Sequence, residues 1–304
     1  MAASPLGAGA LAGGLSDSSG FESNPGVEVT AIDLPRSPFQ QNVLDGQVAF
    51  VTGGATGIGK EICRVLGHHG ARIAIASRKQ AALDAAAAEL RTEGIEVWVG
   101  SADVRDAAAV RSVVDRIVAH YGRLDIVVNN AAGNFPAPMT HISPNGFKAV
   151  VDIDLLGTYH VSKAAFDAWL GEHGGNIVNI TAPFERMGPA LQAHVAAAKA
   201  GVDSLTRTCA VEWGPRGVRV NAIAPGEIGG TEGVQRFAAA VPGSRPRNPV
   251  GGVGHGADVA YMVLYFVSPA ARFVSGQVIA VDGGSSVDNL KLDVEAISAL
   301  IPKR

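Results

Sequence analysis

The 304-residue sequence contains little that could cross-link it, anchor it in a membrane or attract a polyanion. It has only two cysteines, Cys63 and Cys209, and both fall inside predicted helices, so a disulfide framework is not expected. No run of about 18 apolar residues predicts a membrane-spanning helix. The net charge of −3 predicts no nucleic-acid-binding surface, and no cluster of histidine, cysteine and acidic residues has the spacing of a metal site. With a hydrophobic content of 47%, these absences are typical of a globular enzyme domain.

Targeting signals are missing as well. Residues 1–43 are rich in alanine, glycine, serine and proline, and they have neither the arginine-rich character of a transit peptide nor the apolar stretch of a signal peptide. The chain ends in Pro302-Lys303-Arg304, which is not the Ser-Lys-Leu peroxisomal signal. We expect residues 1–43 to form a flexible extension, with a partner-contacting arm as the alternative, and residues 287–304 to form a tail. We also expect a cytoplasmic protein.

Between these ends, short apolar runs alternate with alanine-rich helical patterns. The apolar runs predict buried strands at Val48–Val51, Arg72–Ala76, Ile95–Val99, Leu124–Val128, Asn176–Ile180, Val218–Ile223 and Gln277–Val281. The stretches between them predict helices near residues 79–92, 106–120, 145–171, 190–213 and 257–267. Such alternation predicts an α/β fold of the Rossmann type over residues 44–286. In this fold a doubly wound parallel sheet binds its ligand at the carboxyl ends of the strands.

A glycine-rich turn follows the first predicted strand and precedes a helical pattern. Glycines in such a turn allow a tight bend, close approach of the backbone to a pyrophosphate, and packing of the helix on the strand. The phosphates would bind the N–H groups at the helix N-terminus, although such turns also occur for structural reasons alone. The predicted phosphate-binding residues are Gly53, Thr56, Gly57, Ile58 and Gly59.

The residues after the second predicted strand indicate which nucleotide is bound. Ser77, Arg78 and Lys79 follow that strand, and no acidic residue is present to hold a ribose 2′-hydroxyl, as an NAD-binding site would require. A hydroxyl and cationic side chains suit a 2′-phosphate instead. Arg78 could also be an ordinary solvated residue at a helix start. We predict NADP(H) as the cofactor, with Ser77 and Arg78 contacting the 2′-phosphate.

Three motifs occur in the order and spacing of a known family. Thr52–Gly59, Asn129–Gly133 and Pro225–Ile228 together resemble the short-chain dehydrogenase/reductase family, over about residues 45–284. The resemblance implies a single Rossmann-type domain, usually assembled as a homotetramer. It also implies further nucleotide contacts at Asp103, Val104, Asn130, Ala131, Lys199, Pro225, Gly226 and Ile228.

The family's usual reaction depends on four side chains, of which this sequence keeps one. A tyrosine exchanges the proton of an alcohol, a lysine lowers the pKa of that tyrosine, a serine holds the carbonyl oxygen, and an asparagine completes the set. The corresponding residues here are Val195, Lys199, Ala182 and Asp154. Valine cannot move a proton and alanine cannot polarise a carbonyl, so routine exchange between ketone and alcohol is disfavoured.

A finer resemblance points to the 2,4-dienoyl-CoA reductases, which also lack the usual tyrosine, and within them to the peroxisomal branch. The similar segments are Asn129–Phe135, Asp152–Asp154, Asn179–Ala182, Ala190–His194, Ala210–Pro215 and Gly230–Gly233.

The peroxisomal branch is thought to obtain its proton from a water held by an aspartate and the lysine, and Asp154 and Lys199 match those positions. The mitochondrial branch uses a different tyrosine, at a position where this sequence has Phe184. We therefore predict Asp154 and Lys199 as the catalytic residues. Asp154 could instead belong to a structural hydrogen-bond network, and Lys199 could be a structural cation. His194 is either a third proton carrier or a wall of the pocket.

An acyl-CoA substrate needs cationic contacts and a long groove. The same resemblance implies such contacts for several residues, and the segment of about 227–256, rich in glycine, proline and arginine, is expected to be a substrate lid. The implied substrate residues are Arg105, Phe135, Ser143, Asn145 and Arg236.

The function we predict is NADPH-dependent reduction of 2,4-dienoyl-CoA to 3-enoyl-CoA in the breakdown of unsaturated fatty acids. Hydride would add at the far end of the diene, and a water would protonate the α-carbon. Two alternatives remain. One is a reductase of another CoA thioester or of a carbonyl compound, and the other is a catalytically silent NADP-binding sensor or oligomer partner.

Overall fold

The computed structural model describes residues 37, 39–184, 187–240 and 248–288. Seven strands form one parallel sheet, in the order β3-β2-β1-β4-β5-β6-β7. The order reverses between β1 and β4, and in doubly wound sheets the ligand binds at the carboxyl ends of the strands beside such a reversal. The strands are β1 Val48–Thr52, β2 Arg72–Ser77, β3 Val97–Ser101, β4 Ile126–Asn129, β5 Gly175–Ile180, β6 Val218–Pro225 and β7 Val278–Val281.

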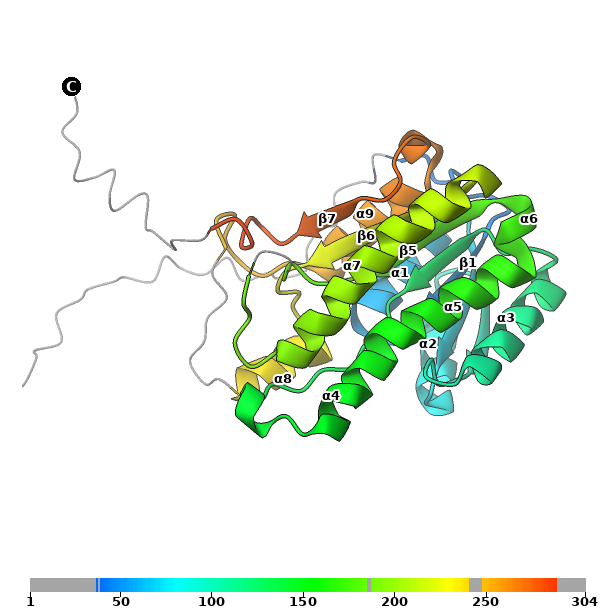
Figure 1. Cartoon of the computed structure of the whole chain (residues 1–304). Helices are drawn as coiled ribbons and strands as arrows, with labels where there is room; N and C mark the ends of the chain where they lie inside the picture. The colour runs from blue at the N-terminus through cyan, green and yellow to red at the C-terminus, as the bar shows by residue number, and fades with distance from the viewer. Residues whose placement is uncertain (1–36, 38, 185–186, 241–247, 289–304) are drawn as a thin grey trace, which may run out of the picture. The chain divides into compact units, whose positions relative to one another are not determined.

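Helices cover both faces of the sheet (Figure 1). The helices are α1 Gly57–His68, α2 Gln80–Thr92, α3 Ala107–Tyr121, α4 Pro144–Val151, α5 Gly157–Ala165, α6 Gly171–His173, α7 Ala193–Trp213, α8 Glu232–Ala240 and α9 Gly256–Val267. Helices α1, α2 and α9 pack on one face, and α3, α5 and α7 pack on the other. Within β1, Ala49 and Val51 join the first core while Val48 and Phe50 join the second. Alternate residues of a strand point to opposite faces, so a sheet covered twice requires continuous apolar runs.

This arrangement confirms the predicted Rossmann-type parallel sheet and each of its strands, with small shifts at the ends. One such shift is at β3, which was expected from Ile95 and begins at Val97. Gly94 has a φ of +82°, and the Ile95 N–H returns to the Leu90 carbonyl at the end of α2. Ile95 therefore belongs to the turn that closes the helix, because its backbone donor is already used there.

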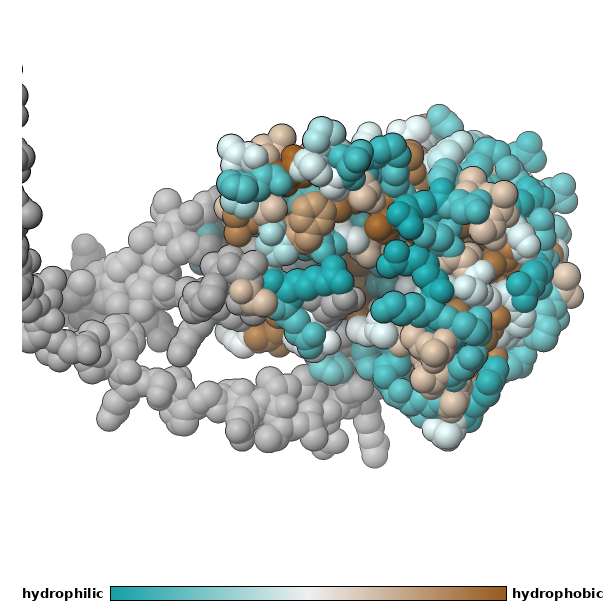
Figure 2. Space-filling view, turned by 90° about the horizontal axis from the view of Figure 1, so that it is seen from below, coloured by the Kyte–Doolittle hydropathy of each residue, from teal (hydrophilic) through white to brown (hydrophobic). Residues whose placement is uncertain are grey.

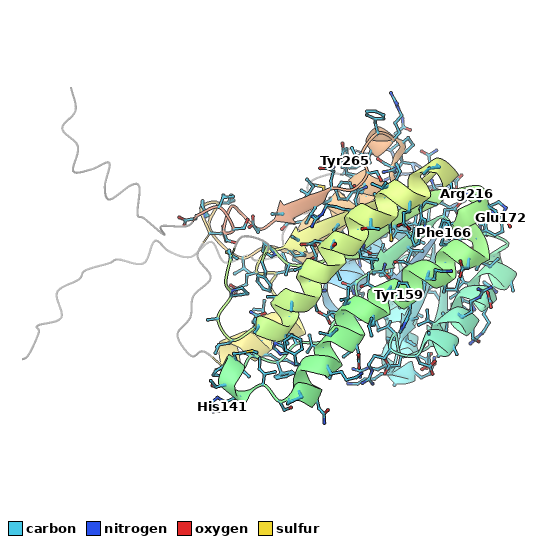
Figure 3. The ribbon with its side chains drawn as sticks, in the orientation of Figure 1. His141, Tyr159, Phe166, Glu172, Arg216 and Tyr265 are labelled. Atoms are coloured by element: carbon cyan, nitrogen blue, oxygen red, sulfur yellow. The ribbon has the colours of Figure 1, made fainter. Side chains whose placement is uncertain are left out.

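The helix expected over residues 145–171 is a continuous run from Pro144 to His173, interrupted twice by π-turns. These are η2, Asp152–Leu156, and η3, Phe166–Leu170. In Figure 3 the run lies alongside α7, and Phe166 points toward that helix, where its ring stacks on Trp213 at a centroid distance of 4.4 Å. The run also contacts α7 through α4 and through η2, the π-turn that contains Asp154.

The segment of about 227–256, expected to be a substrate lid, contains a nine-residue helix, α8, near its centre. Residues 232–240 contain only one glycine and no proline, although the residues on either side are rich in both. Residues 241–247 of the same segment lie outside the described residues. In Figure 1, α8 lies at the side to which the carboxyl ends of the strands point, together with the first turn of α7.

The described residues just before β1 contact the core. Phe39 and Val43 pack against the first core cluster, and the Ser37 hydroxyl lies 2.7 Å from Nε2 of the buried His69. A flexible extension was expected over residues 1–43 and a tail over residues 287–304; residues 1–36 and 289–304 lie outside the described residues, so for them both remain predictions.

No helix in the described ranges is long and apolar enough to cross a membrane. The face shown in Figure 2 is mostly hydrophilic, with hydrophobic residues in small groups. Cys63 and Cys209 are both buried and free, in α1 and α7.

Candidate active site

A cavity of about 430 Å³ opens at the carboxyl ends of β1, β2, β4 and β5, where the strand order reverses. It collects residues from the glycine-rich turn, the ends of β2, β4, β5 and β6, π-turn η2, the start of α7, and α8. Most predicted nucleotide residues and both predicted catalytic residues line it: Gly53, Thr56, Gly57, Ile58, Gly59, Ser77, Arg78, Asp103, Val104, Asn130, Ala131, Asp154, Lys199 and Pro225.

The glycine-rich turn has the geometry that a bound pyrophosphate requires. Gly53 and Gly57 have φ values of +66° and +53°, a left-handed conformation that favours glycine. A Cβ on Gly59 would lie 2.5 Å from the Gly53 carbonyl oxygen and 2.5 Å from Nδ2 of Asn130. Only a glycine can therefore bring the first turn of α1 this close to β1 and β4, with its N–H groups facing the cavity edge.

Replacing Gly59 with alanine should damage this turn. We expect the free energy of unfolding to fall by about 1–3 kcal/mol, because the methyl group overpacks the contact between α1 and the two strands. Nucleotide affinity should fall about tenfold or more, since a displacement that costs about 1.4 kcal/mol of binding already has that effect. Thermal melting and NADPH titration would measure both. Gly188→Ala is the matched control, because a Cβ there meets no atom within 4 Å; equal behaviour of the two variants would contradict the assignment.

The end of the cavity beside β2 fits a phosphorylated ribose. The exposed Arg78 guanidinium makes no hydrogen bond or ion pair to any residue in the described ranges, although its charge acts on Asp103. Asp103 is held by Arg105, whose Nη2 lies 2.6 Å from Oδ2, and this contact lowers the pKa of the Asp103 carboxyl. An unpaired arginine fork beside Ser77 is therefore available for an anion, while Arg105 is already engaged and does not line the cavity.

Other predicted nucleotide residues contribute backbone rather than side chains. The Thr52 hydroxyl accepts hydrogen bonds from the N–H groups of Asn130 (3.0 Å) and Ala131 (3.1 Å), which fixes the turn after β4. Ile228 is 2% exposed, and a Cβ on Gly226 would lie 2.7 Å from Asp282. Neither Gly226 nor Ile228 lines the cavity, so their nucleotide contacts remain predictions.

Asp154 is buried where π-turn η2 faces the cavity, and it is 1% exposed. Its Oδ1 accepts a hydrogen bond of 2.7 Å from the Gly133 N–H. A Cβ on Gly133 would lie 2.8 Å from Cδ1 of Ile153, so a larger residue here would require that side chain to move. Oδ2 is buried and has no hydrogen-bond partner among the described residues. π-Turns often occur at functional sites, and here the turn presents one carboxylate oxygen that is free to bind a small polar molecule.

Lys199 faces that oxygen from the second turn of α7. Its Nζ donates a 2.8 Å hydrogen bond to the Ile180 carbonyl and lies 3.5 Å from Oδ2 of Asp154. An ammonium group has three donors, so this contact leaves donors for a ligand. The buried cation and anion compensate each other's charge, and a water between them could both accept from the lysine and donate to the carboxylate.

Related enzymes have a catalytic hydroxyl at residue 182, 184 or 195. All three residues line the cavity here, but none of them carries a hydroxyl. Ala182, Phe184 and Val195 lie around the Asp154–Lys199 pair and offer no proton donor. Within the described part of the chain, no grouping of histidine, cysteine, aspartate and glutamate could hold a metal ion. The only ionic pair that lines this cavity at its catalytic end is Asp154–Lys199, among the described residues.

The predicted substrate residues lie in different places. Arg236 of α8 lines the cavity and donates a 2.8 Å hydrogen bond to the Asn134 carbonyl. Phe135 is 37% exposed, does not line the cavity and packs on His194, so its substrate contact remains a prediction. Ser143 accepts the Gly146 N–H as the N-cap of α4, and Asn145 is exposed in the first turn of that helix. Neither Ser143 nor Asn145 lines the cavity, so their substrate contacts remain predictions, as does that of Arg105.

Sequence reasoning missed several residues that shape the site. Asn134 donates to Gln192 at 3.3 Å, and both line the cavity together with Thr181 and Thr231. Leu191 has a φ of +67°, the only positive value of a non-glycine residue in the described ranges. Its carbonyl accepts the Ala137 N–H at 2.9 Å, which ties the start of α7 to the loop after β4. Asn134 follows the predicted β4 motif directly, which is the one signal that could have indicated it.

Comparison with known proteins places this geometry in a family. A family model described as enoyl-(acyl carrier protein) reductase matches residues 53–286. The chain is 42% identical over 270 residues to the (3E)-enoyl-CoA-producing peroxisomal 2,4-dienoyl-CoA reductase of Danio rerio, covering 88% of this chain and 90% of the relative. It is 37% identical over 246 residues to a probable (2E)-enoyl-CoA-producing 2,4-dienoyl-CoA reductase of Bacillus subtilis, covering 79% and 97%.

Solved structures agree with these relatives. The crystal structure of an actinorhodin polyketide ketoreductase variant with NADPH has a TM-score of 0.76 and 31% identity, and the match covers 79% of this chain and 97% of that one. A citronellol catabolism dehydrogenase of Pseudomonas aeruginosa has a TM-score of 0.72 and 37% identity, covering 82% and 99%.

Proposed function

The chain belongs to the short-chain dehydrogenase/reductase family, and on that premise we propose that it reduces 2,4-dienoyl-CoA to 3-enoyl-CoA with NADPH. It is an oxidoreductase, as its matches to dienoyl-CoA reductases over most of the chain show. The observation that carries the proposal is the buried Asp154–Lys199 pair, which has one open carboxylate oxygen and no hydroxyl at residues 182, 184 or 195. This site can hold a water, and it offers no phenol for exchange between ketone and alcohol.

The residues of the site divide the work of a conjugate reduction. When bound, NADPH supplies the hydride that adds at the far end of the diene. The dienolate of the thioester then needs a proton at its α-carbon. Lys199 and Asp154 hold and polarise a water, and that water gives its proton to the carbon. Lys199 stabilises the hydroxide that remains, because its Nζ is 2.8 Å from the Ile180 carbonyl and stays fixed in place.

Because a 3-enoyl product leaves no new hydroxyl, a tyrosine at residue 195 would have no proton to exchange in this reaction. The relatives include one named for a (3E)-enoyl product and one named for a (2E)-enoyl product, so the position of product protonation is the specific part of the proposal. A water held by Asp154 at the α-carbon favours the 3-enoyl product.

Cofactor selectivity gives a separate prediction. The free guanidinium of Arg78 beside Ser77 supports NADPH, and a charge-assisted arginine–phosphate contact is worth about 1.5–3 kcal/mol. We expect Arg78→Ala to lower kcat/KM for NADPH about tenfold or more and to leave kcat/KM for NADH nearly unchanged. Steady-state kinetics with both nucleotides measure this. Arg111→Ala, which removes an exposed arginine from the surface of α3, is the control. Equal use of NADH by the unmodified protein would overturn the choice of NADPH.

Two other functions make different predictions from the same site. A carbonyl reductase would need a donor for the carbonyl oxygen at residues 182 or 195, which are alanine and valine. A silent NADP-binding protein would have no use for a buried carboxylate with an open oxygen next to the predicted nicotinamide end. NADPH oxidation measured with 2,4-hexadienoyl-CoA, 2-hexenoyl-CoA and 3-oxohexanoyl-CoA separates them. The proposal expects turnover of the first alone, and turnover of the third alone or of none would reject it.

Two further expectations accompany this proposal. Assembly as a homotetramer and a cytoplasmic location both remain predictions. The acyl-CoA is proposed as the substrate that enters beside Arg236 and α8, and the lid role of this segment remains part of the proposal.

A further inference from the structure

His194 is the most deeply buried titratable group near the site that the reaction above does not use. It lies in the first turn of α7 and is 0% exposed, and its ring nitrogens make no well-formed hydrogen bond among the described residues, although the Phe135 backbone lies close enough to raise its pKa as a hydrogen-bond partner. Buried polar atoms are almost always bonded to protein or to ordered water. A satisfied histidine in a core would show such a partner, as His69 does with the Val65 carbonyl at 2.6 Å.

The surroundings of His194 connect it to the catalytic pair. Helix α7 packs against π-turn η2, which carries Asp154, and Oδ2 of Asp154 is also a buried polar atom without a hydrogen bond among the described residues. The Phe135 ring covers the imidazole edge-on, with the centroids 4.3 Å apart, and Phe135 is itself 37% exposed. His194 thus lies between a catalytic carboxylate on one side and a partly exposed aromatic ring on the other.

Burial, rather than the neighbouring charges, keeps the ring of His194 neutral near pH 7. Burial lowers the pKa of His194, and the backbone of Phe135 and the carboxylate of Asp154 offset this only in part. The other charged groups nearby are Lys199 on the same helix and Arg236 of α8, which binds the carbonyl of Asn134. A neutral imidazole has one donor nitrogen and one acceptor nitrogen, and it can pass a proton by exchanging these roles.

We propose that His194 relays protons to the water held by Asp154 and Lys199. This inference rests on the proposed function, because that reaction consumes one proton from solvent in each turnover. The α-carbon of the substrate takes a proton from the held water and leaves hydroxide. The N–H of His194 returns a proton through a second water, and its other nitrogen takes one from solvent when the partly exposed Phe135 ring, which covers the buried imidazole, moves aside. The imidazole ends in its other neutral tautomer, so no charge accumulates, and ring rotation or exchange with solvent restores the first tautomer.

In this role His194 positions and replenishes the catalytic water without touching the substrate. It also explains why a histidine occupies a place that an apolar side chain could fill with less desolvation. If His194 were only a wall of the pocket, a glutamine of similar size would replace it without consequence for proton transfer.

The test uses His194→Gln, which keeps a donor and an acceptor but cannot exchange a proton between them. With 2,4-hexadienoyl-CoA we expect kcat to fall about 10- to 100-fold, the lower part of the range for proton-transfer groups. The KM for NADPH and the melting temperature should stay close to those of the unmodified protein. The solvent deuterium isotope effect on kcat should rise, because reprotonation becomes rate-limiting. His173→Gln, at an exposed site on α6, is the control and should change none of these quantities.

Two further measurements distinguish a proton relay at His194 from a purely structural role. In His194→Ala, added imidazole should restore kcat, whereas a purely structural histidine would show lost stability without rescue. Nitrogen NMR of the imidazole needs no turnover: we expect a neutral ring at pH 7 whose pKa falls further in Asp154→Asn, because a favourable negative charge is removed. A kcat of His194→Gln within twofold of normal would overturn the relay. So would a pKa of His194 that does not change in Asp154→Asn. If the unmodified protein does not reduce the dienoyl thioester, the proposed function fails, and NMR alone decides whether His194 is coupled to Asp154.

Discussion

Lys199→Met is expected to lower kcat for 2,4-dienoyl-CoA reduction by about 10³- to 10⁴-fold, the upper part of the range for acid–base groups. The lysine orients the water that protonates the substrate, and it stabilises the hydroxide left behind. It is also predicted to contact the nicotinamide ribose, so NADPH should bind more weakly. Its loss leaves the 1%-exposed Asp154 as an uncompensated buried charge. Removing one partner of a buried ion pair costs about 3–5 kcal/mol, so we also expect a lower melting temperature.

Lys199→Met is expected to lower both the stability and kcat, so the two losses have to be measured separately. Activity should be measured at a temperature well below the melting point of the variant, with circular dichroism confirming the fold. Lys163→Met is the matched control, since Lys163 is exposed on α5 and pairs only with Asp167. A folded Lys199→Met protein with kcat within tenfold of normal would show that the lysine is not part of the proton supply.

Asp154→Asn should lower kcat by about 10²- to 10³-fold while leaving NADPH affinity within about threefold, because the change touches the proton supply and not the nucleotide loop. The asparagine keeps the shape of the side chain, and its oxygen can still accept the Gly133 N–H. It loses the negative charge that binds and polarises the water. Steady-state kinetics and fluorescence titration of NADPH measure the two quantities. Asp115→Asn, on the exposed surface of α3, is the control.

Asp154 and Lys199 should act as one unit. If both hold the same water, the double variant should lose little more than Lys199→Met alone, because the second change removes a function that is already absent. Fully multiplied losses would mean that the two residues support separate steps. Near-normal turnover of Asp154→Asn would leave the carboxylate as a structural residue that only fixes the Gly133 turn.

The sheet could be predicted because each strand is buried on both faces. Such strands must be apolar throughout, so runs such as Val48–Val51 stand out against the alanine-rich helices between them. The nucleotide turn was equally visible, because Gly53, Gly57 and Gly59 are each required by backbone conformation or by close approach. Local requirements of this kind can be recognised in the sequence.

Features that depend on tertiary packing could not be predicted from the sequence. Neighbours far along the chain determine the π-turn that buries Asp154, the left-handed conformation of Leu191 and the helix α8. No local sequence pattern predicts these features. The open oxygen of Asp154 and the unpartnered nitrogens of His194 are likewise properties of the assembled site. The sequence could name Asp154 and Lys199 as a pair, but the 3.5 Å separation and the burial that make the pair useful come from the fold.

The central claim is that the proton enters at the α-carbon from water held by Asp154 and Lys199. The most direct test reduces 2,4-hexadienoyl-CoA with NADPH in D₂O and determines the product by NMR. The account predicts a 3-hexenoyl-CoA with one deuterium at C2 and none at C5, where the hydride adds. In Asp154→Asn the same product should form more slowly. A 2-hexenoyl-CoA with deuterium at C4, or no oxidation of NADPH by the unmodified protein, would contradict it.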